Sequence, residues 1–99
     1  MIILGPSGRT AITTDDVIAA LAAATGDQAL RNAGITAATR LEGDLWLDSL
    51  DLAALSSLLR DRYGPQVDLV GHVAGLDIDE IIGLTVGDVA AYVNRTAAA

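Results

Sequence analysis

Several residue types are absent or scarce in this chain, and each absence excludes some chemistry. There is no cysteine, so the chain can form neither a disulfide nor a thiolate metal site, and any thiol chemistry must come from an attached group. There is no phenylalanine, and aromatic residues make up only 3% of the chain, so leucine, isoleucine, valine and alanine must build the core. Because that composition suits closely packed helices, we expect an all-α protein.

Positive charge and long apolar runs are also scarce. Lysine is absent, and six arginines stand against thirteen acidic residues, which gives a net charge of −7. Such a charge repels a phosphate backbone, so we expect no nucleic-acid partner. The apolar start at residues 1–4 is too short for a signal sequence, and the apolar runs are far shorter than a membrane span. We therefore expect a cytoplasmic protein with no membrane partner.

The length of 99 residues fits one small domain, for which a monomer is the default expectation. Glycine and proline in the Gly-Pro-Ser-Gly sequence at residues 5–8 disfavour regular structure, so residues 1–12 are predicted to be a flexible extension. The chain ends in three alanines, and residues 95–99 are predicted to be a frayed tail. The folded domain should then occupy residues 13–94.

Capping signals and helical spacing predict the first helix. Thr13 can cap its start with Asp16 three residues later, and Gly26 provides a stop. A short turn is predicted over residues 27–33, and residues 35–43 lack a sustained period and indicate a long loop.

Similar signals predict three later helices. Asp48 with Asp51 predicts a helix that begins at residue 48 or 49 and ends before residue 64. Residues 77–83 predict one short helix, and a capping box at residues 85–88 opens the last helix. Residues 66–76 fit a strand-like loop or a helical turn equally well. The expected architecture is a small four-helix bundle of three main helices and one short helix, with a long loop after the first helix.

One stretch carries a functional signal. Residues 44–50 have the sequence DLWLDSL, which places Ser49 at the start of the apolar-striped second helix, and the capped final helix follows at residues 85–89. Although the Asp-Ser-Leu tripeptide alone is common, its position and its distance to the final helix are more specific. In this combination residues 13–93 resemble the acyl carrier protein family. The resemblance implies the four-helix bundle of the acyl-carrier type.

The resemblance also implies a function for Ser49. In this family the corresponding serine carries 4′-phosphopantetheine, which a phosphopantetheinyl transferase transfers from coenzyme A, and the thiol of that group holds intermediates as thioesters. The aspartate before the serine, here Asp48, helps to hold the magnesium ion of the transferase. A phosphodiester on Ser49 would lie at the positive end of the helix dipole, although Asp48 and Asp51 would partly oppose it. On this interpretation the chain is not itself an enzyme and has no metal site of its own.

Partner contacts are expected beside the serine, at Trp46, Leu50 and Asp51. Trp46 stands where the family commonly has glycine, three residues before the serine. Two interpretations are open for Trp46, packing against the second helix or contact with a partner, and the usual burial of tryptophan favours packing. The implied partners are the transferase, an acyltransferase or ligase, and the synthase enzymes of one pathway.

Other departures from the family pattern bear on the cargo. The second helix carries Arg60 and Arg62 and few acids, whereas fatty-acid carriers usually present a strongly acidic helix there. Peptidyl carriers typically have two glycines in place of Trp46 and Leu47. We therefore expect a discrete carrier of acyl or polyketide intermediates in specialised metabolism, with fatty-acid and aminoacyl cargo as open alternatives. The family's cargo cavity lies between the central helices, and its candidate walls are Leu52, Ala53, Leu59 and Ile81 or Ile82.

Rival functions are judged on the same residues. A serine hydrolase needs a base and an orienting partner, but His72 is the only histidine and no Gly-x-Ser-x-Gly motif surrounds Ser49. The glycines of residues 5–10 lack the spacing and the lysine of a phosphate-binding loop, and residues 77–80 lack the ligand spacing of a calcium loop. The main alternative is a small unmodified helical adaptor that docks a partner helix through Leu50 and Leu58.

Overall fold

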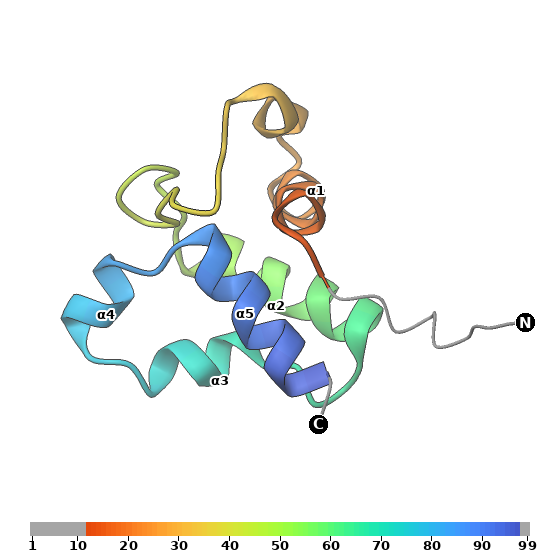
Figure 1. Cartoon of the computed structure of the whole chain (residues 1–99), viewed down its shortest axis with the longest axis vertical. Coiled ribbons are helices and arrows are strands. Elements are labelled where there is room, and N and C mark those ends of the chain that lie inside the picture. The colour runs from red at the N-terminus through yellow and green to blue at the C-terminus, as the bar shows by residue number, and fades with distance from the viewer. Residues whose placement is uncertain (1–11, 98–99) are drawn as a thin grey trace, which may run out of the picture.

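The computed structural model describes residues 12–97, which are mostly helical (Figure 1). No strand is present in this range, and an isolated antiparallel bridge joins Arg40 and Thr85. The all-α prediction is therefore confirmed. The elements in chain order are α1 (Thr14–Thr25), the 3₁₀ helix η2 (Gln28–Asn32), α2 (Ser49–Tyr63), α3 (Leu69–Ala74), α4 (Ile78–Ile82) and α5 (Val86–Ala97).

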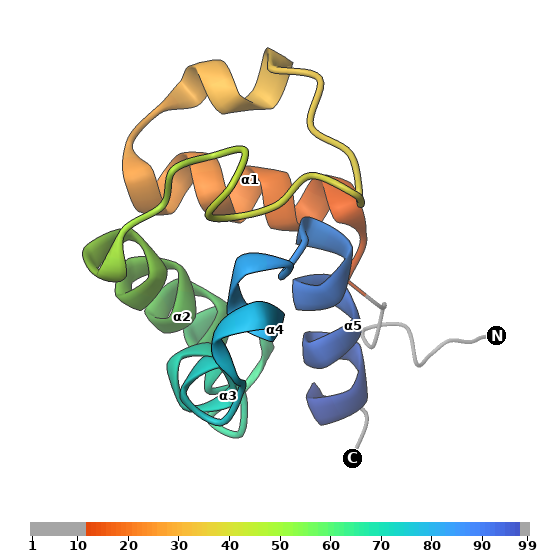
Figure 2. The same ribbon diagram turned by 90° about the vertical axis from the view of Figure 1, so that its left-hand side faces the viewer.

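The three long helices form the frame of the molecule. α1 packs against both α2 and α5, and Figure 2 shows it lying across them, with η2 on its outer side. α3 packs against α2, and α4 lies on the side of the molecule that faces the viewer in Figure 2. None of the helices within residues 12–97 has the length and apolar character needed to cross a bilayer.

The number of short helices differs from the expectation. Residues 69–74, for which the sequence left two alternatives, form helix α3, so the described chain has two short α-helices instead of one. The final helix runs to Ala97 and thus includes residues 95–97, which were expected to fray. The predicted flexible extension over residues 1–12 lies outside the described residues except for Ile12, which is buried. Asn94 on α5 holds Ile12 by two hydrogen bonds, accepting from its N–H at 2.8 Å and donating to its carbonyl at 3.1 Å.

The helix starts follow the local capping signals. At α1 the Thr13 hydroxyl accepts from the Asp16 N–H at 3.2 Å, and the Asp16 carboxylate accepts from the Thr13 N–H at 2.9 Å. The same reciprocal pair opens α5 between Thr85 and Asp88. α1 ends as predicted at Gly26, whose φ of 76° lies in the left-handed region that favours glycine.

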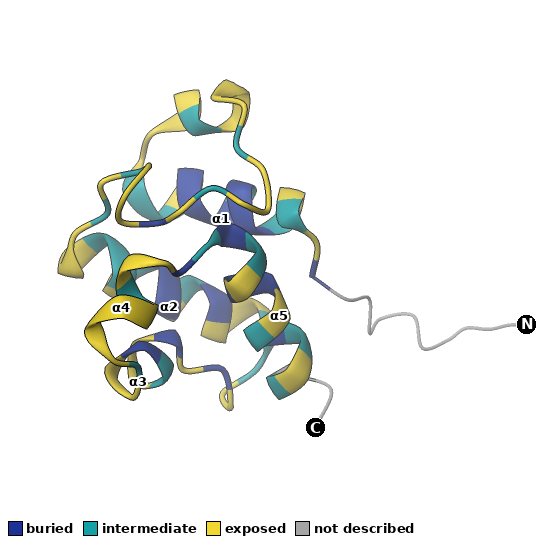
Figure 3. Ribbon diagram, turned by 60° about the vertical axis from the view of Figure 1, so that its left-hand side comes forward, coloured by how far each residue is buried: buried dark blue, intermediate teal, exposed yellow. Residues whose placement is uncertain are grey.

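The core is built from aliphatic side chains, as the composition requires. Figure 3 shows that buried positions line the inner faces of α1, α2 and α5, whereas α4 is exposed along most of its length. Burying such side chains is the main stabilising contribution in a domain of this size. The largest fully buried side chains are those of Val17, Leu21, Leu55, Leu59, Val67, Leu69, Val86, Val89 and Val93.

The predicted long loop between η2 and α2 is fixed to the start of α5. The Leu41 N–H donates to the Leu84 carbonyl at 3.0 Å, and the Val86 N–H donates to the Thr39 carbonyl at 2.8 Å. A further bond joins the Gly87 N–H to the Ala37 carbonyl at 2.9 Å. These bonds pin the loop before it turns into α2.

Candidate functional site

Ser49 is the first residue of α2, and its side chain is exposed. Asp48 precedes it as the N-cap, and its carboxylate accepts from the Asp51 N–H at 2.9 Å. The Asp51 carboxylate accepts in return from the Asp48 N–H at 3.4 Å. The capping role predicted for these two residues is confirmed, and it leaves the Ser49 hydroxyl at the accessible end of the helix.

A tight turn leads the chain into α2. The Arg40 N–H donates to the Asp44 carboxylate at 2.8 Å, and the guanidinium of Arg40 forms an ion pair with the same group at 3.3 Å. The backbone hydrogen bond from Arg40, followed by the side-chain hydrogen bond, lowers the pKa of Asp44 below its ordinary value. The Leu47 N–H then donates to the Leu41 carbonyl at 3.1 Å, so the two ends of the turn lie together.

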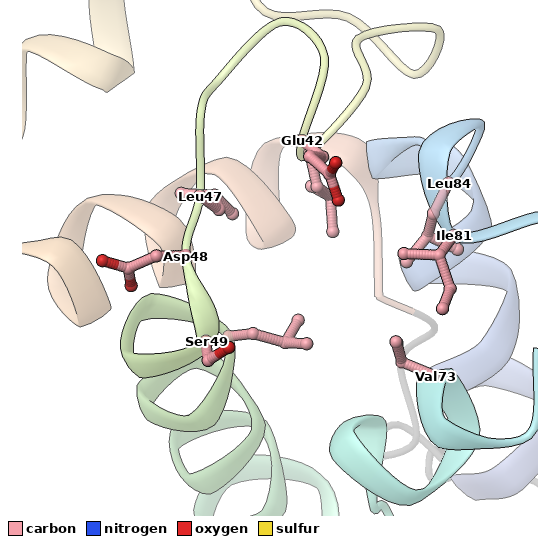
Figure 4. A pocket seen from close by; sticks show the side chains of 9 residues that line it. Glu42, Leu47, Asp48, Ser49, Val73, Ile81 and Leu84 are labelled. Carbon is pink, nitrogen blue, oxygen red and sulfur yellow. The ribbon is translucent and has the colours of Figure 1, made fainter. Parts of the chain in front are cut away.

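A cavity of about 370 Å³ opens beside Ser49 (Figure 4). Ser49 and Asp48 stand on one side of it, and Val73 and Ile81 approach from α3 and α4 on the other. Such a volume falls within the range of small-molecule sites. The lining residues are Leu41, Glu42, Leu47, Asp48, Ser49, Leu52, Val73, Ile81 and Leu84.

The structure brings only part of the expected cavity wall together. Leu52 and Ile81 line the cavity, as expected from the resemblance. Leu59, which is fully buried in the core, and Ala53, which is exposed, do not line it, so the expectations for these two residues were wrong. Of the alternatives Ile81 and Ile82, the structure places Ile81 at the cavity.

Contributions from Leu41, Glu42, Val73 and Leu84 were missed by the sequence reasoning. Leu41 and Glu42 come from the loop that precedes α2, whereas Val73 in α3 and Leu84 between α4 and α5 are distant in sequence from Ser49. The apolar residues of region 66–76 were a usable signal, since a helical assignment there would have placed an apolar face near α2.

Side-chain contacts from α2 hold α3 beside the cavity. The buried hydroxyl of Ser56 accepts from the Val70 N–H at 3.3 Å. Arg60 donates to the Val67 carbonyl at 3.1 Å and forms an ion pair with Asp68 at 3.6 Å. These contacts position Val73, which forms part of the wall.

Trp46 does not pack against α2. Its side chain is 83% exposed, so the favoured interpretation, packing against the second helix, was wrong. The other interpretation, contact with a partner, stays a prediction. The φ of 57° makes Trp46 the one non-glycine residue in the described chain with a positive φ. The left-handed region costs a side-chain-bearing residue about 1–2 kcal/mol relative to glycine. This cost gives a physical reason for the glycine that the acyl carrier family commonly has at this position.

The other expected partner contacts differ in exposure. Leu50 is 80% exposed and points away from the core, whereas Asp51 is half-buried and occupied by capping. Leu58 packs against the core, so the apolar edge expected from Leu50 and Leu58 together is reduced to Leu50.

The chemistry of this site fits the prosthetic group that the resemblance implies. An exposed serine hydroxyl is available for a phosphodiester bond, and the first turn of α2 supplies the positive end of a helix dipole. The cavity next to it offers apolar surface to a chain carried at the end of such a group. Asp48 is exposed, so its carboxylate is accessible to a metal ion held by a second protein.

The residues 12–97 contain no cluster of three or more acidic or histidine side chains that could hold a metal ion. His72 stacks on Tyr92 with ring centroids 4.3 Å apart, and it does not line the cavity beside Ser49. His72, the single histidine of the chain, is therefore not placed to act as a base toward Ser49.

Comparisons with known protein families, with curated proteins and with solved structures found no match to this chain.

Proposed function

We propose that this chain is a discrete acyl carrier protein with a helical bundle of the acyl-carrier type. Ser49 carries 4′-phosphopantetheine, and the thiol of that group holds acyl or polyketide intermediates as thioesters. The observation that carries the proposal is the exposed hydroxyl of Ser49 at the first position of α2, directly beside an apolar cavity of about 370 Å³. The cargo class and the assignment to specialised metabolism follow from the departures in sequence described above.

Each part of the site has a role in this proposal. The start of α2 favours the phosphodiester electrostatically, and Asp48 helps to hold the magnesium ion of the phosphopantetheinyl transferase. The attached group supplies the thiol that the chain itself lacks. Trp46 and Leu50 flank Ser49 with exposed apolar surface, which suits contact with the transferase, the loading enzyme and the synthase.

Modification of the purified chain tests the proposal. The full chain is incubated with coenzyme A, Mg²⁺ and a broad-specificity phosphopantetheinyl transferase, and its intact mass is measured. We expect one phosphopantetheine per chain in the wild type and none in Ser49→Ala. Ser57→Ala is the matched control, because Ser57 is another exposed serine on the same helix, and it should be modified like the wild type. An unchanged wild-type mass, with a known carrier protein modified in parallel, would contradict the proposal.

Complementation tests the pathway assignment separately. A strain that lacks its fatty-acid carrier should not regain full growth when it expresses this chain. Full recovery would favour a role in fatty-acid synthesis over one in specialised metabolism.

The alternative function is an adaptor that binds a partner without modification. The exposure of Trp46 and Leu50 is the observation that favours it, because large apolar side chains at the surface often mark protein contacts. The two functions differ in their dependence on Ser49. A partner that binds wild type and Ser49→Ala equally, from a host in which the wild type stays unmodified, would support the adaptor.

A further inference from the structure

The charge at the cavity beside Ser49 leads to an inference about the cargo, which rests on the proposed carrier function. We propose that this cavity accepts acyl chains with an uncharged end and excludes chains that end in a carboxylate. Glu42 is the specificity-determining residue, because its carboxylate lies at the edge of an otherwise apolar wall. Figure 4 shows Glu42 between Leu47 and Leu84 on that edge.

Most of the residues that line the cavity are apolar. Its polar members are Glu42, Asp48 and Ser49, and none of the nine described lining residues is basic. The apolar members, which come from the loop, α2, α3 and the α4 region, are Leu41, Leu47, Leu52, Val73, Ile81 and Leu84.

Glu42 takes part in neither of the two ion pairs within residues 12–97. Arg40 is the nearest arginine in sequence, but it pairs with Asp44 at 3.3 Å. The second ion pair within residues 12–97 joins Arg60 and Asp68. Asp48 differs from Glu42, because its carboxylate is already engaged by the Asp51 N–H. Glu42 is thus the carboxylate on this wall whose charge acts directly on a bound chain.

Two physical effects act against a charged chain end. A carboxylate that enters the cavity loses its hydration, and the leucine, isoleucine and valine side chains offer it no hydrogen-bond donor. It also approaches the carboxylate of Glu42, and like charges repel. A methyl end meets neither effect and gains from burial of its apolar surface. The cavity therefore separates two chains of equal length by the charge at their ends.

A matched pair of cargoes tests this inference. The transferase loads Ser49 from hexanoyl-coenzyme A or from adipoyl-coenzyme A, whose acyl groups differ in having a methyl or a carboxylate at the far end. Two quantities are measured on the full chain: the methyl chemical shifts of Val73, Ile81 and Leu84, and the rate of thioester cleavage by hydroxylamine. The same thioesters of free pantetheine give the reference rates.

The wild type should respond to hexanoyl cargo alone. We expect the three sets of methyl shifts to move with hexanoyl cargo, and the cleavage rate to fall about tenfold below the reference, because burial shields the thioester. Adipoyl cargo should leave the shifts unchanged and stay within about twofold of its own reference rate. Equal responses to the two cargoes would overturn the inference.

Variants at Glu42 assign the selectivity to that residue. Glu42→Gln should reduce the difference between the cargoes, and Glu42→Lys should protect adipoyl cargo about as well as hexanoyl cargo, because it replaces repulsion with attraction. Asp61→Asn is the control for total charge, since it removes the same charge from an exposed position of α2 that does not line the cavity. It should behave like the wild type, and a Glu42→Lys protein with wild-type selectivity would contradict the role of Glu42.

The outcomes separate the inference from the carrier function. If the transferase leaves Ser49 unmodified, the carrier function itself is contradicted. If Ser49 is loaded but the methyl groups of the cavity respond to neither cargo, the carrier function stands and the inference is overturned.

Discussion

Asp48 and Asp51 cap α2 reciprocally, with the Asp48 carboxylate 2.9 Å from the Asp51 backbone nitrogen and the Asp51 carboxylate 3.4 Å from the Asp48 backbone nitrogen. The pair fixes the first turn of α2 around Ser49. In the proposed function Asp48 also helps to hold the magnesium ion of a transferase. These two roles make different demands on the side chain, because capping needs an oxygen acceptor and metal binding needs a negative charge.

Two substitutions at Asp48 separate these roles. Asp48→Asn keeps a good N-cap, so we expect nearly wild-type stability, whereas Asp48→Ala should lower the free energy of unfolding by about 1 kcal/mol. Both variants lose the charge, so both should slow phosphopantetheine transfer on the order of tenfold. Urea denaturation measures the first effect and the time course of intact mass measures the second. Wild-type transfer rates in Asp48→Asn would limit Asp48 to capping.

Trp46 offers a test of backbone strain beside the site. Its side chain is 83% exposed, so Trp46→Gly removes little packing. Its φ of 57° lies in the left-handed region, so the same substitution relieves the backbone strain that a side chain causes there. Relief of about 1–2 kcal/mol should exceed the entropic cost of about 0.5–1 kcal/mol that glycine adds, which gives a net gain of up to about 1.5 kcal/mol. Trp46→Ala, the matched control, keeps the strained φ and should give no such gain. Equal stabilities of the two variants in thermal denaturation would contradict this account.

The lowered pKa of Asp44 predicts that the stability of the fold depends on pH. Hydrogen bonds from Arg40 lower its pKa in the folded state below the ordinary value of 3.8. A lowered folded-state pKa means that the charged form stabilises the fold. The contribution is therefore complete above pH 3.8 and is lost as the pH falls through the lower folded-state value.

The substitution Asp44→Asn isolates that contribution, because an amide oxygen can still accept from the Arg40 N–H. We expect the variant to be less stable than the wild type at neutral pH, and we expect the difference to shrink as the pH falls through the lowered folded-state pKa of Asp44. Urea denaturation over a series of pH values from neutral into the acid range measures it. A difference that stays constant with pH would show that the carboxylate charge does not stabilise the turn.

Much of the fold could be predicted from local sequence signals. The capping residues Thr13, Asp48, Asp77 and Thr85 lie at the starts of α1, α2, α4 and α5 because a cap involves groups only a few residues apart. The position of Ser49 at the start of α2 follows from the same signal. The aliphatic composition likewise fixed the kind of core that the chain could form.

Only the tertiary structure decided the features that depend on distant contacts. Residues 69–74 became a helix where the sequence left two alternatives, with Ser56 and Arg60 of α2 holding the segment in place. Trp46 lies exposed in the turn into α2, where its backbone is left-handed, and the usual burial of tryptophan did not anticipate this.

At the cavity beside Ser49, local sequence determined some features and tertiary packing determined others. The sequence by itself determined that a serine would open the second main helix and that the chain would bring no thiol of its own. Which side chains face that serine was decided by packing, since Leu41, Glu42, Val73 and Leu84 reach it from segments that local patterns do not place relative to α2. Local hydrogen bonds can be recognised from neighbouring residues, whereas a cavity depends on how whole elements pack.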